Sequence, residues 1–169
     1  MRIALIALLC TASAVAQTQP AMPTAACGPG NVSFKVKLDD SHQTEAKLEP
    51  GKALAYFIHD AGSAQALFAY PTTKVGVDRA WVGANHGNSY FAVSVDPGEH
   101  HLCATLQSSI YDSRAEFAHF TAEAGMVYYF RSRLITSRSV ELLELDPIDS
   151  DQGKYLTTMY PLSISQPKK

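Results

Sequence analysis

Histidine is the residue type in this sequence that most directly suggests chemistry, because the neutral imidazole is a common transition-metal ligand. The chain has six histidines. His100 and His101 are neighbours on a predicted strand, so their side chains leave opposite faces and do not share one ion. The sequence contains no His-x-His pair and no His-Glu-x-x-His motif. We predict no metal site and keep one alternative open, a site assembled from the distant residues His101, His119 and Glu99.

The sequence motifs of nucleophilic catalysis and cofactor binding are also missing. The chain has no Gly-x-Ser-x-Gly nucleophile motif. Its Gly28-Pro29-Gly30 segment is not a phosphate loop, because proline removes a backbone donor and no helix follows. The acidic stretch Asp149–Gly153 has its glycine one position too early for an EF-hand calcium loop. We therefore predict no catalytic and no cofactor-binding residue, and a protein that is not an enzyme.

Aromatic and arginine side chains that the strand pattern turns outward are candidates for a binding surface. Tryptophan, tyrosine and arginine dominate the energetic hot spots of protein interfaces. The alternative is that these side chains cover the rims of a sandwich, where an aromatic ring has one wet side. The candidate binding surface consists of Trp81, Tyr90, Tyr129, Arg131 and Arg133.

The N-terminus has the three parts of a secretory signal peptide, which we assign to residues 1–16. Arg2 precedes the apolar run Ile3–Leu9, and the segment ends in Ala14-Val15-Ala16. We expect cleavage between Ala16 and Gln17 and a periplasmic or secreted protein. The apolar run is far shorter than the roughly 20 residues of a transmembrane helix.

The positions of the cysteines indicate whether the chain carries a lipid anchor and whether it forms a disulfide. We expect no lipid anchor, because Cys10 lies within the apolar part of the signal peptide and Cys27 has Thr24 where lipid attachment needs a leucine. Removal of the signal peptide leaves Cys27 and Cys103, and an even pair in an oxidising compartment predicts a disulfide. Closing that loop stabilises by about 4.5 kcal/mol on the chain-entropy model. The alternative is two buried thiols.

Length and charge limit the architecture and the partners. The 169 residues amount to one domain, and their 46% hydrophobic content argues against a disordered chain. The 14 Lys and Arg against 16 Asp and Glu give a net charge of −2, so no global basic field attracts nucleic acid. We expect a flexible leader over residues 17–30 and a single domain over residues 31–165.

Short segments of alternating polarity, separated by glycine and proline turns, predict the elements of this domain. Pro97-Gly98 and Gly125 mark two of the turns, and His100 follows the first. We predict an all-β fold, an antiparallel two-sheet sandwich of about seven or eight strands. The strand signals are Asn31–Leu38, Ala53–His59, Thr72–Asp78, Trp81–Gly83, Ser89–Val95, His100–Gln107, Glu116–Ala122, Met126–Leu134 and Ser139–Leu145.

One short helix is predicted near the C-terminus. Asp146 is suited to its N-cap and Pro147 to its first helical position, and the helix is expected to run to about Met159. The last residues, Pro161–Lys169, are expected to add a short edge strand.

Several of these motifs resemble a bacterial domain-of-unknown-function family, number 2846, of small envelope proteins and lipoproteins. The resemblance covers residues 51–156. Its markers are Pro97-Gly98-x-His100, Ala124-Gly125-x-x-Tyr128-Tyr129 and the step from Asp151 to Gly153. None of these residues is catalytic in that family, so the resemblance implies an envelope location and no functional residue.

Together these observations predict an exported, non-enzymatic β-sandwich module that binds a protein or a glycan of the cell envelope. The alternative is a hydrolase or metalloenzyme with a dispersed site around His100, His101 and His119. A third hypothesis is an accessory subunit whose exposed strand edge is completed by a larger partner.

Overall fold

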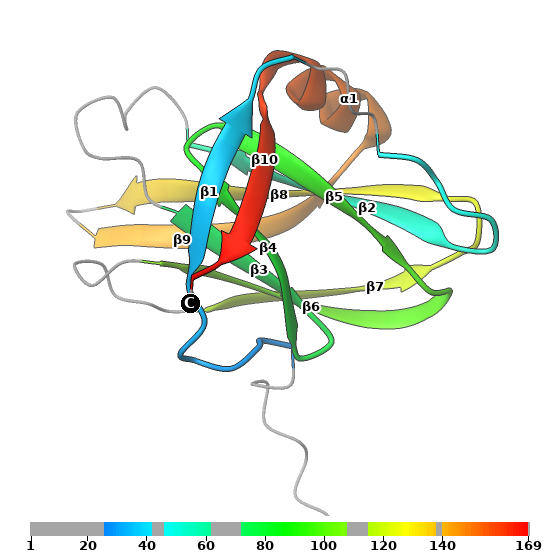
Figure 1. Cartoon of the computed structure of the whole chain (residues 1–169), viewed down its shortest axis with the longest axis horizontal. Coiled ribbons are helices and arrows are strands. Elements are labelled where there is room, and N and C mark those ends of the chain that lie inside the picture. The colour runs from blue at the N-terminus through cyan, green and yellow to red at the C-terminus, as the bar shows by residue number, and fades with distance from the viewer. Residues whose placement is uncertain (1–25, 42–45, 62–71, 108–114, 138–139, 169) are drawn as a thin grey trace, which may run out of the picture.

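The computed structural model describes residues 26–41, 46–61, 72–107, 115–137 and 140–168 of the chain. The predicted signal peptide and most of the predicted leader lie outside this part. The described residues form ten strands and one helix (Figure 1). These are β1 (Phe34–Asp39), β2 (Ala53–Asp60), β3 (Thr72–Val77), β4 (Ala80–His86), β5 (Ser89–Val95), β6 (Gly98–Leu106), β7 (Glu116–Ala122), β8 (Val127–Ser137), β9 (Val140–Ile148), α1 (Ser150–Met159) and β10 (Leu162–Pro167).

The strands form two sheets, as predicted for a sandwich. One sheet has six strands in the order β1-β10-β5-β2-β8-β9, and the other has four in the order β4-β3-β6-β7. The smaller sheet is antiparallel throughout. The ribbon of β1 and β10 folds over β4 (Figure 1). The Ala84 amide of β4 donates to Ser165 Oγ of β10 at 3.1 Å.

The prediction of seven or eight strands in a purely antiparallel arrangement is wrong. Ten strands are present, and the larger sheet is mixed because β2 runs parallel to β8 and β10 parallel to β5. The whole smaller sheet lies between β2 and β8 in sequence, so the chain returns by a long crossover rather than by a hairpin. The C-terminal strand β10 lies between β1 and β5, so the edge position predicted for it is also wrong.

The main core lies between the two sheets. Strand β2 contributes every second residue to it, including Ala53, Ala55 and Phe57, and strand β6 of the other sheet contributes Leu102 and Ala104. Phenylalanine rings bridge the strands, with centroids 5.5 Å apart for Phe57 and Phe91 and 5.6 Å for Phe57 and Phe130. Burying each such ring contributes about 1.5–3 kcal/mol to folding.

Helix α1 covers part of the outer face of the six-stranded sheet. Its N-cap is Asp149, whose carboxylate accepts from the Asp151 and Gln152 amides at 2.9 Å each. The predicted cap at Asp146 is therefore wrong, because β9 continues through Pro147 and Ile148. Proline is tolerated there since β9 is an edge strand. The helix ends at Met159 as predicted.

Candidate functional site

The structure separates the five residues of the predicted binding surface into three groups. Arg131 and Arg133 are two residues apart on β8, so both lie on its outer face. Tyr129 shares that face and packs with Tyr90 of β5 in a cluster under α1. Trp81 lies on β4, in the other sheet. The five side chains therefore do not form one continuous surface.

Trp81 contacts the N-terminal segment 26–33, which we call the strap. The indole Nε1 donates to the Pro29 carbonyl at 2.8 Å. Gly28 lies so close to the ring that a β-carbon there would come within 2.3 Å of it. The Lys74 ammonium lies 4.3 Å from the ring centroid and donates to the Val32 carbonyl at 2.9 Å. Trp81 thus holds the strap on the four-stranded sheet.

A disulfide between Cys27 and Cys103 fixes the same strap, as the cysteine count predicted. The Arg79 amide donates to the Ala26 carbonyl at 3.2 Å beside it. Gly76 accommodates the strap closely, since a β-carbon there would lie 2.8 Å from the Ala26 oxygen. The described end of the predicted leader is therefore held against the sheet.

The tyrosine cluster under α1 is mostly buried. Tyr56 and Tyr129 stack with centroids 5.0 Å apart and an angle of 15° between their planes. Tyr90 is 9% exposed and Tyr129 8% exposed, and burial raises the pKa of Tyr129. Leu156 of the helix belongs to the same cluster. These rings are packed beneath α1 next to the arginines, and they do not form an exposed aromatic surface.

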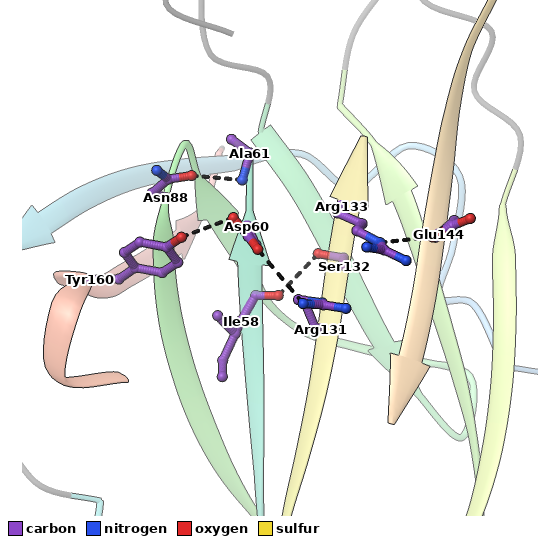
Figure 2. Close-up of polar contacts among 9 residues, drawn as sticks. All are labelled: Ile58, Asp60, Ala61, Asn88, Arg131, Ser132, Arg133, Glu144 and Tyr160. Carbon is purple, nitrogen blue, oxygen red and sulfur yellow. Dashed lines mark hydrogen bonds and ion pairs between the residues drawn. The ribbon is translucent and has the colours of Figure 1, made fainter. Parts of the chain in front are cut away.

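Asp60 and Tyr160 join Arg131 at the end of β2 (Figure 2). The Tyr160 hydroxyl donates to Asp60 Oδ1 at 2.9 Å, and Arg131 Nη1 lies 3.9 Å from Asp60 Oδ2. Burial, together with the hydrogen bond to Asp60, raises the pKa of Tyr160 well above its usual value. Arg131 Nε is buried and has no hydrogen-bond partner among the described residues.

Arg133 and Glu144 form an ion pair beside this group (Figure 2). Arg133 Nε donates to Glu144 Oε2 at 2.8 Å across the β8–β9 register. The two side chains are 41% and 36% exposed, so the pair contributes little to stability. We define the polar site as Asp60, Arg131, Arg133, Glu144 and Tyr160.

A second polar group lies directly behind the polar site, on the inner face of the sheet. His59 Nδ1 lies 2.9 Å from Ser132 Oγ and 3.4 Å from Thr73 Oγ1. The His59 side chain is 0% exposed, and this burial lowers its pKa to about 4. A serine beside a histidine can form a nucleophile–base pair. Here both residues are buried in the interior, His59 at 0% and Ser132 at 2% exposure.

The three histidines of the alternative hydrolase or metalloenzyme site, His100, His101 and His119, lie on both faces of the four-stranded sheet. The His100 nitrogens contact Asp78 Oδ2 at 2.5 Å and the Asp96 carbonyl at 2.6 Å. Burial disfavours its charged form, but these two contacts outweigh burial and raise the pKa of His100. His101 instead lies opposite His119. Among the residues that the structure describes, no group of three or more His, Cys, Asp or Glu is arranged to hold a metal ion.

Sequence reasoning missed Asp60, Glu144 and Tyr160. The adjacent His59 and Asp60 match no catalytic motif, and strand alternation places them on opposite faces of the sheet. Glu144 lies on the strand that follows the one with Arg131 and Arg133. This position points to an ion pair only when the register of β8 and β9 is known. Tyr160 carried no signal of its own, because it reaches Asp60 from 100 residues away.

In comparisons with known proteins, no family model, no curated protein and no solved structure matches this chain. Among the described residues, no helix is long and apolar enough to cross a membrane.

Proposed function

We propose that this chain is an exported, non-enzymatic binding module of the cell envelope whose ligand is a neutral glycan bound at the polar site. The observation that carries the proposal is the pairing of each arginine with a carboxylate, Arg131 beside Asp60 and Arg133 with Glu144. The predicted signal peptide and the Cys27–Cys103 disulfide support export to an oxidising compartment, periplasmic or extracellular.

The charge balance of the polar site favours a neutral ligand. Asp60 and Glu144 offset the charges of Arg131 and Arg133, and Asp146 lies opposite Arg131 in the sheet. An anionic ligand would have to displace these carboxylates from the arginines. A sugar hydroxyl both donates and accepts, so neighbouring hydroxyls can accept from a guanidinium and donate to its carboxylate. The arginine–carboxylate pairs therefore match vicinal hydroxyl groups.

The polar site is also rigidly supported, which lowers the entropic cost of binding. Strand β8 is hydrogen-bonded on both sides, to β2 and to β9. The end of β2 is fixed by the Ala61 amide, which donates to Asn88 Oδ1 at 2.6 Å (Figure 2). Tyr160 holds Asp60 from the segment after α1.

The test is to screen the exported protein on a glycan array and to titrate the best neutral oligosaccharide by calorimetry. Arg133→Ala and Glu144→Ala each remove a charged hydrogen-bonding group, so we expect each to weaken binding about tenfold or more. Lys35→Ala, an exposed basic residue of β1 at the far edge of the sheet, is the matched control and is expected to bind like wild type. Unchanged binding by Arg133→Ala, a preference for acidic sugars, or no glycan binding would each refute the proposal.

We also propose that the chain is related to the domain-of-unknown-function family 2846. The residues of the shared motifs are not catalytic in that family. Their contacts in this chain support the proposal, because these residues hold turns and strands together. His100 links the Asp96 carbonyl to Asp78, and Gly125 has a φ of +84° that favours glycine. The Tyr128 hydroxyl accepts from the Glu123 amide at 3.0 Å.

A further inference from the structure

The outer face of the four-stranded sheet carries two histidines that lie directly opposite each other. His101 of β6 and His119 of β7 are Cα partners in the antiparallel register. Their ring centroids are 6.5 Å apart, and both side chains are exposed, His101 to 58%. The pair lies on the other sheet from the polar site, so any role of these two histidines is independent of the proposed glycan-binding function.

The hydrogen bonds of His101 show that this is the close type of cross-strand pair. Its amide donates to Asp78 Oδ1 at 2.9 Å, and its carbonyl accepts from the Asp78 amide at 3.0 Å. Both backbone groups of His101 therefore point toward the β3–β4 turn and away from β7. His101 and His119 are thus a non-hydrogen-bonded pair, in which Cα atoms lie about 4.5 Å apart and side chains are closest.

This spacing allows the two rings to bind one ion. Zn–N bonds of about 2.0–2.1 Å require the two ligating nitrogens to lie within about 4 Å of each other. The rings reach this separation by rotating toward each other about their side-chain torsions. Both side chains are exposed, so solvent borders the rings that rotate.

Glu99 lies on the same face and can supply a third donor once the side chains rotate, since the three groups are not arranged around an ion in the structure as it stands. It precedes His101 by two residues on β6, and its Oε1 lies 3.8 Å from His101 Nε2. The nearby Cys103 is bound in the disulfide and His100 is engaged on the opposite face, so neither contributes. Two imidazoles and one carboxylate form a donor set suited to copper, nickel and zinc rather than to magnesium or calcium.

We propose that His101 and His119 form a bidentate site for a divalent ion of the late first transition series, with Glu99 as an additional oxygen ligand. Water completes the coordination, since the face is open to solvent. The site binds Cu²⁺ most tightly, following the general order of affinities of such donors.

The test is a titration of Cu²⁺ into the disulfide-bonded protein, followed by calorimetry and by electron paramagnetic resonance. We expect one ion per chain at this site, with a spectrum of two coordinated imidazoles. His101→Ala and His119→Ala are each expected to weaken binding about tenfold or more and to abolish the two-imidazole signature. Glu99→Gln is expected to weaken binding and to keep that signature.

The matched control is His86→Ala, which removes an imidazole from β4 and leaves the pair intact. It is expected to bind Cu²⁺ like wild type. Thermal unfolding gives a second measurement, because an ion that binds the folded chain raises its melting temperature in wild type and less in His119→Ala. An unchanged two-imidazole spectrum in His119→Ala, or no binding by wild type, would overturn the proposal.

Discussion

His59 shows at the scale of one residue how the interior of the sandwich controls protonation. The ring is completely buried, and desolvation by burial lowers its pKa from 6.5 to about 4 despite the nearby Asp60 carboxylate. The folded protein therefore holds His59 neutral, with Nδ1 against Ser132 and Thr73. Between pH 6.5 and about 4 the unfolded chain binds a proton at this residue that the folded chain does not bind.

This difference predicts that stability falls as the pH falls through that window. The contribution of His59 is fully present above pH 6.5 and decreases by up to about 1.4 kcal/mol per pH unit toward pH 4. His59→Gln removes the titrating group, so its free energy of unfolding should depend less steeply on pH. Denaturant unfolding of both proteins at about pH 7 and about pH 5 measures the difference. An equal loss of unfolding free energy between the two pH values in wild type and variant would contradict the prediction.

The residue-scale predictions from sequence were accurate for side-chain direction and inaccurate for partners. The strand pattern over Met126–Leu134 predicts that Tyr129 and Arg131 face away from the main core, and Tyr129 indeed lies in the separate cluster under α1. The same pattern could not pair residues on distant strands. His59 meets Ser132 across 73 residues, and only the β2–β8 pairing brings them together.

At the scale of an element, one close contact holds helix α1 on the six-stranded sheet. Gly153 packs against the ring of Tyr129, and a β-carbon at that position would come within 2.2 Å of the ring atoms. Tyr129 cannot move freely, because it stacks on Tyr56. The glycine thus lowers helix propensity and permits the close approach of helix and sheet.

We predict that Gly153→Ala destabilises the protein by about 1–3 kcal/mol, because overpacking outweighs the gain of about 1 kcal/mol in helix propensity. Lys154→Ala, at the adjacent exposed position of the same helix, is the control and is expected to change stability by less than about 0.5 kcal/mol. Denaturant unfolding measures both variants. A stabilised Gly153→Ala protein would show that α1 is not held against Tyr129.

At the same scale, the sequence predicted most strands and the helix but not their order. Ser89–Val95 has the same bounds in prediction and structure. Strand β9 is longer than predicted because Asp146-Pro147 fits a helix start and an edge strand equally well. The polarity of single strands carries no information on whether neighbours run parallel, so the pairing of β2 with β8 was not predictable.

At the scale of the whole molecule, the two sheets present different chemistry on their outer faces. The larger sheet carries the balanced arginine–carboxylate pairs, partly covered by α1. The smaller sheet carries the His101–His119 pair and the N-terminal strap. Counting cysteines was sufficient to predict the disulfide. It could not predict the path of the strap over Gly76 and Trp81, which depends on contacts between residues far apart in sequence.

The strap leads to a prediction about the molecule as a whole. The Cys27–Cys103 bridge joins residues 76 apart, so reduction is expected to lower the free energy of unfolding. We expect a loss of about 2–4 kcal/mol, the typical range for disulfides, which lies below the value of about 4.5 kcal/mol from the chain-entropy model. Trp81 is the single tryptophan of the chain and lies under the strap. Release of the strap therefore exposes the indole, and its fluorescence should shift to longer wavelength while the far-ultraviolet circular dichroism of the strands persists.

The double variant Cys27→Ser/Cys103→Ser provides the control for this measurement. Without reductant it should show the emission of the reduced wild type, and added reductant should leave it unchanged. In the reduced protein, the emission shift should be present at denaturant concentrations below those of global unfolding, because the core between the sheets does not include the strap. Identical emission from the oxidised and reduced folded proteins would mean that the contacts of Pro29 and Val32 hold the strap without the bridge.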